Sequence, residues 1–290
     1  MKNFDLSVPV TPLLRLEEGI YAKLETSNRT GSVKDRFVFE AVKRAIQVGE
    51  ICDDSVLVEA TSGNTGISLA AAGAAVGLPV KIVMPCNMSE ERKRMMRLFG
   101  AEVIEVGPSD FAAAIELRNK MVQELPHHWS PMQFESQLNL QVHSLYTGPE
   151  IAHQMRNNFG STQWDFVTGA GTGGTLMGVR EFLIYSAENL GTEHRVVQVV
   201  PDEDAATHGI QGINDGQDFL LDPALMDDQI RIRTQDAVQA ARELASTHGL
   251  LVGISAGANV CAARLHRARN PDRDVVTLLC DRGERYLSIL

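Results

Sequence analysis

The sequence predicts an α/β protein in which parallel-rich, twisted sheets are flanked by helices. Short runs of β-branched residues alternate with longer segments rich in alanine and leucine, and this alternation is typical of repeated βαβ units. The chain has 290 residues, of which 44% are hydrophobic and 22% are charged, enough for about two domains with substantial cores. Glycine-rich corners follow several expected strands, at the end of a parallel sheet where ligands bind.

The expected elements follow this alternation along the chain. In the first half, strands are expected at 56–60, 81–85 and 102–107, each leading into a helix, the first from about 64 and the second from about 89. Ser89 is suited to cap the second helix, and Gly100 to end it. In the second half, strands are expected at 165–169, 195–200, 231–234 and 275–280.

The segment between these halves has no clear period and contains Pro126, Pro131 and Pro149. Because proline interrupts both helices and sheet interiors, we expect a hinge or a crossing region here. The boundary between two α/β lobes is therefore expected at about residues 140–150.

The composition excludes several classes of function. The formal net charge of −10 opposes binding to a nucleic-acid backbone. The N-terminus lacks the apolar stretch of a signal peptide and no run of about 18 apolar residues indicates a membrane span, so we expect a cytoplasmic protein that does not enter membranes. The four cysteines form no CxxC pair and the eight histidines include no HExxH, so we expect reduced, mostly buried thiols and no metal site.

Two glycine-rich corners each join an expected strand to an expected helix. In EATSGNTGISLA (59–70), backbone N–H groups can converge on a carboxylate or phosphate at the positive end of the helix dipole. The alternative is a tight turn capped by Ser62 or Asn64. The second corner, TGAGTGGTLMGV (168–179), satisfies GxGxxG, so a nicotinamide dinucleotide is one interpretation, with Asp202 as the ribose partner. Asp202 lies later than that motif requires, and the threonines favour one compact phosphate.

A third corner and a lysine complete the set. LVGISAGANV (251–260) is expected to be a short apolar strand that leads through Gly257 into a helix, with the hydroxyl of Ser255 at the strand end. Lys34, in GSVKDR (31–36), is an ordinary surface lysine unless its surroundings bury it. A phosphate cradle, a carboxylate cradle, a hydroxyl and a lysine are the parts that pyridoxal phosphate needs from a protein. The lysine must then be neutral to attack the cofactor aldehyde, which requires a desolvated pocket.

Six motifs in order give the sequence a specific likeness. GSVKDR, EATSGNTG, GTGGT, IQGI, GISAGA and CDRGERYLS resemble the O-acetylserine sulfhydrylase (cysteine synthase) family of fold-type II, tryptophan synthase β-like pyridoxal-phosphate enzymes. The resemblance extends from TPLLRL (11–16) to GERYLS (283–288). It implies a larger cofactor-binding domain, 1–35 with 146–290, and a smaller mobile domain, 36–145, that carries the substrate-carboxylate loop. NMSEER and CDRGERYLS are similar to the B-type isoform, whereas GTGGT and IQGI are similar to the A-type, so no subtype is assigned.

The resemblance also assigns roles by position. Lys34 matches the Schiff-base lysine and catalytic base, Asn64 the partner of the ring hydroxyl, and Ser255 the residue that faces the pyridine nitrogen. The phosphate loop matches Gly171, Thr172, Gly173, Gly174 and Thr175, and the group that holds the substrate carboxylate matches Thr61, Ser62, Thr65 and Gln133.

These roles imply a PLP-dependent β-replacement that forms L-cysteine from O-acetyl-L-serine and sulfide through an α-aminoacrylate intermediate. A serine hydroxyl does not hold a proton on the pyridine nitrogen as an aspartate does, so a long-lived carbanion is poorly stabilised and β-elimination is favoured. Lys34, once displaced, can remove the α-proton. Carboxylate binding is expected to fix the geometry and draw the smaller domain shut.

The sequence departs from the family pattern in three places. Arg29 stands where the family motif NPxGS has proline. The segment QFESQLNLQVH (133–143) lacks both prolines of the family motif QFxNPxNPxxH, and this departure leaves the identity of the leaving group and of the nucleophile open. Relatives extend beyond the position of Leu290, so dimer packing or cleft closure is expected to differ. O-phosphoserine is disfavoured because HGIQGINDG (208–216) contains no arginine to meet its charge.

Several alternatives remain on the sequence alone. Thiosulfate, homocysteine or an amine could replace sulfide as the nucleophile. A chain without turnover could still act as a regulatory partner of serine acetyltransferase, whose C-terminal tail relatives bind, although intact Lys34 and Ser255 favour an enzyme. The resemblance further implies a homodimer.

Overall fold

The computed structural model describes residues 5–204, 207–213 and 218–290. Contacts between residues divide the chain into two units. Unit 1 comprises Met1–Pro9 and Asn28–Ser136, and unit 2 comprises Val10–Ser27 and Gln137–Leu290. The chain therefore crosses between the units at residues 9–10, 27–28 and 136–137, and α1, which begins at Lys34, packs on α2 within unit 1. The bounds of the cofactor-binding and mobile domains that the resemblance implies stay a prediction. Movement of the smaller domain stays a prediction.

Unit 1 is built on a parallel sheet with the strand order β5-β4-β3-β6. Its core lies on both faces of the sheet, because successive strand residues point to opposite sides. Val58, Ala60 and Val83 pack with Ala114 of α4 on one face. On the other face, Gly66 and Gly73 let α2 approach Ile82 and Leu57 so closely that an added Cβ would lie 3.0 and 3.6 Å from their side chains. The elements are α1 (Lys34–Gln47), β3 (Val56–Ala60), α2 (Asn64–Val76), β4 (Val80–Pro85), α3 (Glu90–Leu98), β5 (Glu102–Val106), α4 (Phe111–Glu124) and β6 (His128–Trp129).

Local signals set the helix limits in unit 1. The hydroxyl of Ser89 accepts a hydrogen bond from the backbone N–H of Arg92, and Gly100 follows α3 with φ of +89°, so the predicted cap and stop are confirmed. Asp110 caps α4 in the same way through the N–H of Ala113.

Unit 2 contains a second sheet with the strand order β1-β2-β10-β7-β8-β9, in which the described pairs are parallel except for the β1-β2 hairpin. Gly19, with φ of +71°, makes the turn of that hairpin. The elements are β1 (Leu13–Glu17), β2 (Ile20–Leu24), η1 (Glu25–Ser27), α5 (Leu138–Val142), η2 (His143–Thr147), α6 (Gly148–Phe159), β7 (Trp164–Gly169), α7 (Gly174–Leu190), β8 (Val196–Pro201), η3 (Pro223–Leu225), β9 (Asp228–Ile232), α8 (Thr234–His248), α9 (Ile254–Arg269), β10 (Asp274–Leu279) and η4 (Gly283–Tyr286).

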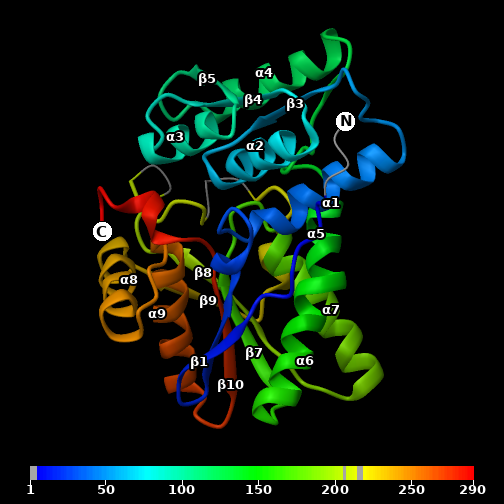
Figure 1. Ribbon diagram of the computed structural model, residues 1–290. Helices are drawn as coiled ribbons and strands as arrows, with labels where there is room; N and C mark the ends of the chain where they lie inside the picture. Colours follow the sequence, from blue (N-terminus) through cyan, green and yellow to red (C-terminus); the bar gives the residue numbers. More distant parts are fainter. Residues whose placement is uncertain (1–4, 205–206, 214–217) are drawn as a thin grey trace. The chain divides into compact units, whose positions relative to one another are not determined.

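Helices cover both faces of the unit 2 sheet, with α8 and α9 on one side and α6 and α7 on the other (Figure 1). Neighbouring strand residues alternate between the two cores. Val167 and Val275 pack towards α8 and α9, whereas Phe166 and Val276 pack towards α6 and α7. This double burial explains why the strands are continuous apolar runs, as parallel strands usually are.

The segment 126–149, where a hinge or crossing region was expected, contains the crossing between the units at 136–137. It also contains β6, α5 and η2 and ends in α6, which has Pro149 in its first turn, where a missing N–H costs nothing. Two expectations from the sequence need correction. The strand expected at 231–234 is β9, Asp228–Ile232, and it ends where α8 begins. The apolar run at 251–255 is not a strand. Only an isolated bridge joins Val252 to Arg282, and α9 begins at Ile254.

The cysteines and the membrane expectation can also be compared with the structure. All four cysteines lie outside disulfide bonds, but the prediction that they are mostly buried is wrong. Cys52 and Cys86 are exposed because they lie in turns beyond α1 and β4, and Cys261 and Cys280 are half-buried. Among the described residues, no helix combines the length and the apolar character needed to cross a membrane.

Candidate active site

Lys34 is the first residue of α1 and is half-buried between fully buried neighbours. The turn that leads into it is fixed by Asp35, which is completely buried. The Asp35 carboxylate accepts hydrogen bonds from the backbone N–H of Thr30 at 2.7 Å, from the Thr30 hydroxyl at 2.6 Å, and from the hydroxyl of Ser68 at 2.5 Å. Because Ser68 lies on α2, these bonds fix the start of α1 against the helix that begins at Asn64.

The first corner places its small residues at the carboxyl end of β3 and the start of α2. Thr61 and Thr65 are buried, Ser62 is half-buried, and Asn64 opens the helix. The N–H of Gly63 donates to the Thr61 hydroxyl at 3.0 Å, so this backbone is already bent into a tight loop. Neither Ser62 nor Asn64 acts as the N-cap of α2, because Gly63 holds that position and no side chain caps it. The alternative of a turn capped by Ser62 or Asn64 is therefore wrong, because no side chain takes the N-cap hydrogen bond of α2.

Gln133 reaches the same corner from the other end of unit 1. Its side-chain oxygen accepts a hydrogen bond from the Thr65 hydroxyl at 2.6 Å, and its side-chain nitrogen donates to the carbonyl of Ala60 at 2.7 Å. The structure thus brings together Gln133, Thr65 and, through the loop, Thr61. The sequence had grouped them only through the family resemblance.

A buried ion pair lies directly behind Gln133. Glu59 and Arg118 are both inaccessible to solvent, and their side chains are 3.1 Å apart. The second carboxylate oxygen of Glu59 accepts the backbone N–H of Gln133 at 3.0 Å. Burial raises the pKa of Glu59 to about 7, while Arg118 and the backbone donors of Gln133 and Ala60 act to lower it. Arg118 also contacts Glu135 at 2.7 Å, so one cation fixes both sides of the Gln133 turn.

In unit 2, the predicted phosphate loop joins β7 to α7 and leaves no room for side chains at its glycines. A Cβ on Gly171 would lie 2.6 Å from the carbonyl oxygen of Gly212, and one on Gly174 would lie 2.4 Å from the side chain of Asn139. Gly173 has φ of +91°, which an L-residue rarely adopts. Since α7 begins at Gly174, the loop lies at the positive end of a 17-residue helix.

The two threonines of this loop are held by the altered QFESQLNLQVH segment. Asn139 of α5 donates to the hydroxyl of Thr172 at 3.0 Å, and His143 shares a hydrogen bond of 3.1 Å with the hydroxyl of Thr175. The other ring nitrogen of His143 bonds Thr147 at 2.9 Å. The segment therefore supports the loop through side chains even though it lacks the prolines of the family pattern.

Ser255 is buried in the first turn of α9. The start of this helix is fixed by the CDRGERYLS motif, because Gly253 donates to the carbonyl of Asp281 at 3.0 Å and Tyr286 donates to the Asp281 carboxylate at 2.6 Å. One turn further along, Asn259 accepts the N–H of Gly169 at 2.8 Å. Asn259 thereby connects the helix that carries Ser255 to the strand that carries the phosphate loop.

The predicted residues divide between the two units. Unit 1 holds Lys34, Thr61, Ser62, Asn64, Thr65 and Gln133, and unit 2 holds Gly171 to Thr175 and Ser255. The supporting residues missed from sequence are Asp35, Glu59, Arg118, Asn139, His143 and Asn259. All of them except Arg118 lie within sequence motifs, namely GSVKDR, EATSGNTGISLA, QFESQLNLQVH and LVGISAGANV, and this is the signal that could have found them. Residues 214–216 of the HGIQGINDG segment lie outside the described residues.

Comparisons with known proteins agree with these features. A loop whose glycines exclude any Cβ, followed at once by a helix N-terminus and two hydroxyls, fits the phosphate of pyridoxal phosphate. The chain is a pyridoxal-phosphate dependent enzyme of fold type II, since the family model described as pyridoxal-phosphate dependent enzyme matches residues 5–281. Within that class, it belongs to the cysteine synthase (O-acetylserine sulfhydrylase) family, which places it among enzymes of cysteine biosynthesis. The dinucleotide interpretation of GxGxxG is set aside.

The individual relatives cover nearly the whole chain. Cysteine synthase B of Campylobacter jejuni is 39% identical over 289 residues, which are 96% of this chain and 94% of the relative. The crystal structure of cysteine synthase from Entamoeba histolytica matches with a TM-score of 0.85 and 34% identity, covering 97% of this chain and 88% of that one. An O-acetylserine dependent cystathionine β-synthase from Helicobacter pylori also gives a TM-score of 0.85, with 30% identity and coverage of 96% and 94%.

Proposed function

We propose that this enzyme forms L-cysteine by β-replacement, exchanging the acetate of O-acetyl-L-serine for sulfide. The observation that carries the proposal is the position of Lys34, half-buried at the start of α1 in a turn held by three hydrogen bonds to Asp35. A lysine that only solubilised the surface would need no such fixed turn.

Pyridoxal phosphate, when bound, supplies the electron sink that makes the α-proton of an amino acid acidic. In this proposal Lys34 holds the cofactor at rest and, as a neutral amine, takes the α-proton while acetate leaves. Its place at the N-terminus of α1 fixes the direction from which the amine acts. Asn64, at the start of α2, is proposed to donate to the ring hydroxyl.

The first corner is proposed to bind the substrate carboxylate. Thr61, Ser62 and Thr65 offer hydroxyls and backbone N–H groups at the open N-terminus of α2, where the helix dipole favours an anion. Gln133, held by Thr65 and Ala60, gives the corner a fixed wall. Such orientation of the reacting group contributes to rate because it removes rotational freedom before the reaction.

The loop Gly171–Thr175 is proposed to bind the cofactor phosphate, and Ser255 to face the pyridine nitrogen with a neutral hydroxyl. Without a carboxylate at this position, nothing holds a proton on that nitrogen, which favours rapid loss of a β-leaving group. Ser255→Asp is expected to slow turnover and to change the visible spectrum of the enzyme on addition of O-acetyl-L-serine. An unchanged spectrum would count against this placement of Ser255.

The test of the proposal pairs Lys34→Ala with Lys43→Ala in the purified holoenzyme. Lys43 lies on the same helix but at the surface, 3.4 Å from Glu40, so its loss should leave activity unchanged. Lys34→Ala should lower formation of L-cysteine by about a hundredfold to ten-thousandfold while circular dichroism stays native. Near-full activity in Lys34→Ala would refute the assignment.

A second nucleophile has specific support. The Helicobacter pylori relative is an O-acetylserine dependent cystathionine β-synthase, and homocysteine is among the nucleophiles that the sequence leaves open. We therefore propose to compare sulfide, thiosulfate, homocysteine and an amine with O-acetyl-L-serine as donor, and O-phosphoserine with sulfide. Faster turnover with sulfide than with every alternative is expected, and a preference for another pair would move the proposal to that reaction.

The remaining properties are proposals of the same family origin. We propose a cytoplasmic homodimer in which unit 1 moves when the carboxylate binds, and association with serine acetyltransferase remains a prediction. Sedimentation of the purified enzyme tests the dimer, and co-sedimentation with serine acetyltransferase tests the association.

A further inference from the structure

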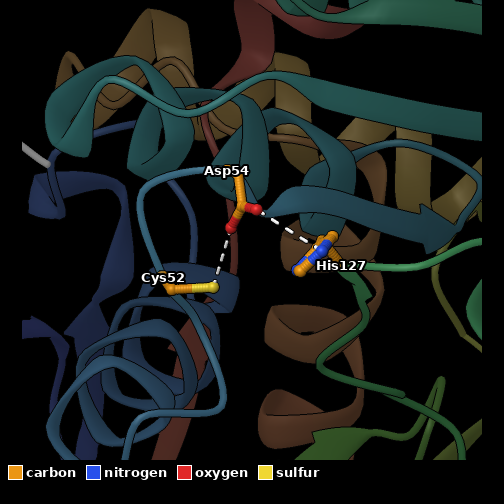
Figure 2. A group of neighbouring side chains, drawn as sticks. All are labelled: Cys52, Asp54 and His127. Carbon is orange, nitrogen blue, oxygen red and sulfur yellow. Dashed lines mark hydrogen bonds and ion pairs between the residues drawn. The ribbon is translucent and has the colours of Figure 1, made fainter.

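Three side chains that differ in ligand chemistry gather on the surface of unit 1. Cys52, Asp54 and His127 each offer one atom, a sulfur, a carboxylate oxygen and an imidazole nitrogen, and these atoms all lie within 4.8 Å of one another. Figure 2 shows the Asp54 carboxylate between the other two groups. One carboxylate oxygen accepts the Cys52 thiol at 2.9 Å, and the other lies 3.4 Å from Nε2 of His127.

Regular structure holds this group together. The turn that contains Cys52 and Asp54 is closed by hydrogen bonds between Cys52 and Ser55 in both directions, at 2.9 and 3.1 Å, and leads at once into β3. His127 immediately precedes β6, the neighbour of β3 in the sheet. The N–H of Val56 donates to the carbonyl of His127 at 2.9 Å, so the two sides are fixed relative to each other.

The backbone of His127 is unusual. Its φ is +62°, in the left-handed region that few residues other than glycine adopt, although histidine does so more often than most. In this conformation its imidazole lies beside Asp54, which is 73 positions earlier in the sequence (127 − 54). The turn before β6 thus places an imidazole beside the thiol and the carboxylate of the turn before β3.

We propose that Cys52, Asp54 and His127 form a zinc-binding site. Thiolate, imidazole and carboxylate are the ligands that Zn²⁺ takes in proteins, and the mixture of soft sulfur with nitrogen and oxygen is less suited to Mg²⁺ or Ca²⁺. Tetrahedral zinc, with bonds of about 2.0–2.3 Å, holds its ligand atoms about 3.3–3.6 Å apart. The three ligand atoms lie within 4.8 Å of one another, so side-chain rotations that bring them closer by about 1–1.5 Å reach this spacing.

Charge and coordination agree with this assignment. On binding, the Cys52 thiol gives its proton to solvent and bonds zinc as a thiolate, while His127 binds through a neutral ring nitrogen. One thiolate and the ionised Asp54 carboxylate balance the two charges of Zn²⁺, so the zinc complex is neutral, whereas the cluster without zinc carries the single negative charge of Asp54. Water takes the fourth position, because the three side chains are exposed.

The site acts as a structural clip rather than a catalytic metal. It joins the turn before β3 to the residue before β6, at the amino ends of two paired parallel strands. The predicted carboxylate corner follows the opposite, carboxyl end of β3. Zinc that binds only the folded form stabilises it by mass action, which comes to about 2.7 kcal/mol at a hundredfold excess over Kd.

The test measures zinc binding to the substrate-free holoenzyme by titration calorimetry and by competition with a chromogenic chelator. The variants are Cys52→Ser and His127→Asn, and the matched control is Cys86→Ser, which removes another exposed, free thiol of unit 1. Wild type and Cys86→Ser should bind one Zn²⁺ per chain with release of a proton, and each ligand variant should bind at least about tenfold more weakly.

Cobalt provides a second, independent readout. Co²⁺ in the wild-type site should give the intense visible bands of tetrahedral coordination and a sulfur-to-metal charge-transfer band, and Cys52→Ser should lose the latter. Zinc binding that is unchanged in both ligand variants, or a wild type that does not bind zinc at micromolar concentration, would overturn the proposal. Circular dichroism on each variant ensures that weaker binding is measured on folded protein.

Discussion

Removal of the buried cation behind the carboxylate corner should destabilise the protein in a pH-dependent way. In Arg118→Met, the methionine fills much of the space of the arginine stem but cannot pair with Glu59, which is also inaccessible to solvent and lies 3.1 Å from Arg118. The carboxylate would keep only the two backbone N–H donors from Ala60 and Gln133. Breaking one partner out of a buried ion pair costs about 3–5 kcal/mol, because the other charge is left uncompensated.

The pH dependence follows from the direction of the Glu59 pKa. Burial raises this pKa from 4.5 to about 7 in the folded protein, so folding binds a proton and the contribution of Glu59 to stability falls as the pH rises from about 4.5 to about 7. Without Arg118 the pKa of Glu59 in the folded protein rises further, so the contribution of Glu59 to stability keeps falling to a higher pH. At about pH 6 Glu59 is mostly protonated in both wild type and Arg118→Met. The variant then loses only hydrogen bonds and packing, which lowers the free energy of unfolding by about 1–3 kcal/mol.

At about pH 8.5 wild-type Glu59 is ionised, whereas the variant must either bury the unpaired charge or keep the proton. If the variant keeps the Glu59 proton, it loses about 1.4 kcal/mol relative to wild type for each pH unit above the wild-type pKa of about 7. From about pH 7 to about pH 8.5 this adds about 2 kcal/mol to the loss of stability. The total of about 3–5 kcal/mol at this pH agrees with the usual cost of breaking a buried pair.

The assay is urea denaturation at about pH 6 and about pH 8.5, followed by circular dichroism. Lys120→Met is the matched control, because Lys120 lies on the same helix, is 64% exposed and should change stability by less than about 0.5 kcal/mol. In a Glu59→Gln background, Arg118→Met should lose its pH dependence. An equal loss of stability at both pH values, or a pH dependence that survives in that background, would refute the reasoning.

Two further predictions concern unit 2. Gly173→Ala should lower the free energy of unfolding by about 1–3 kcal/mol, because φ is +91° and the new Cβ would lie 2.5 Å from a backbone nitrogen. The control, Gly191→Ala, should lose only about 1 kcal/mol, because φ is +65° but nothing lies within 4 Å of the new Cβ. Equal losses for the two variants in urea titration would contradict this prediction. Burial acts to raise the pKa of Asp165, but hydrogen bonds from His266 and Arg273 lower it to about 2. Its stabilisation, about 2–3 kcal/mol, is therefore present above about pH 4 and lost as the pH falls to about 2, and acid unfolding of Asp165→Asn should lack this component.

The strands could be predicted because their burial is written into local sequence. A strand such as β10 packs into a core on each face, so nearly every residue must be apolar, and the run stands out between polar segments. The same signal fails at 251–255, where an apolar run belongs to a loop and the first turn of α9. Periodicity does not separate a short buried strand from a buried helix start, and the deciding contacts come from Asp281 and Tyr286.

The predicted ligand-binding residues could be found through motifs, but the pairs that support them could not. Thr172 depends on Asn139, 33 positions earlier, and Gly169 depends on Asn259, 90 positions later. Such pairs have no fixed spacing, since they form only when helices and strands pack. The proposed zinc ligands are a further case, because His127 joins Cys52 through the pairing of two strands.

The separation along β3 makes the two proposed sites of unit 1 independent. β3 runs from Val56 to Ala60, four steps of about 3.3 Å, so its ends lie about 13 Å apart, beyond the screening length of about 8–10 Å at physiological salt. The charge of zinc near Asp54 is therefore too distant to alter carboxylate binding beyond Ala60. Cys52→Ser and His127→Asn should lose stabilisation by zinc while the KM for O-acetyl-L-serine stays unchanged. A KM that changed with zinc in the wild type alone would show that the clip acts on the carboxylate corner through the strand rather than on stability only.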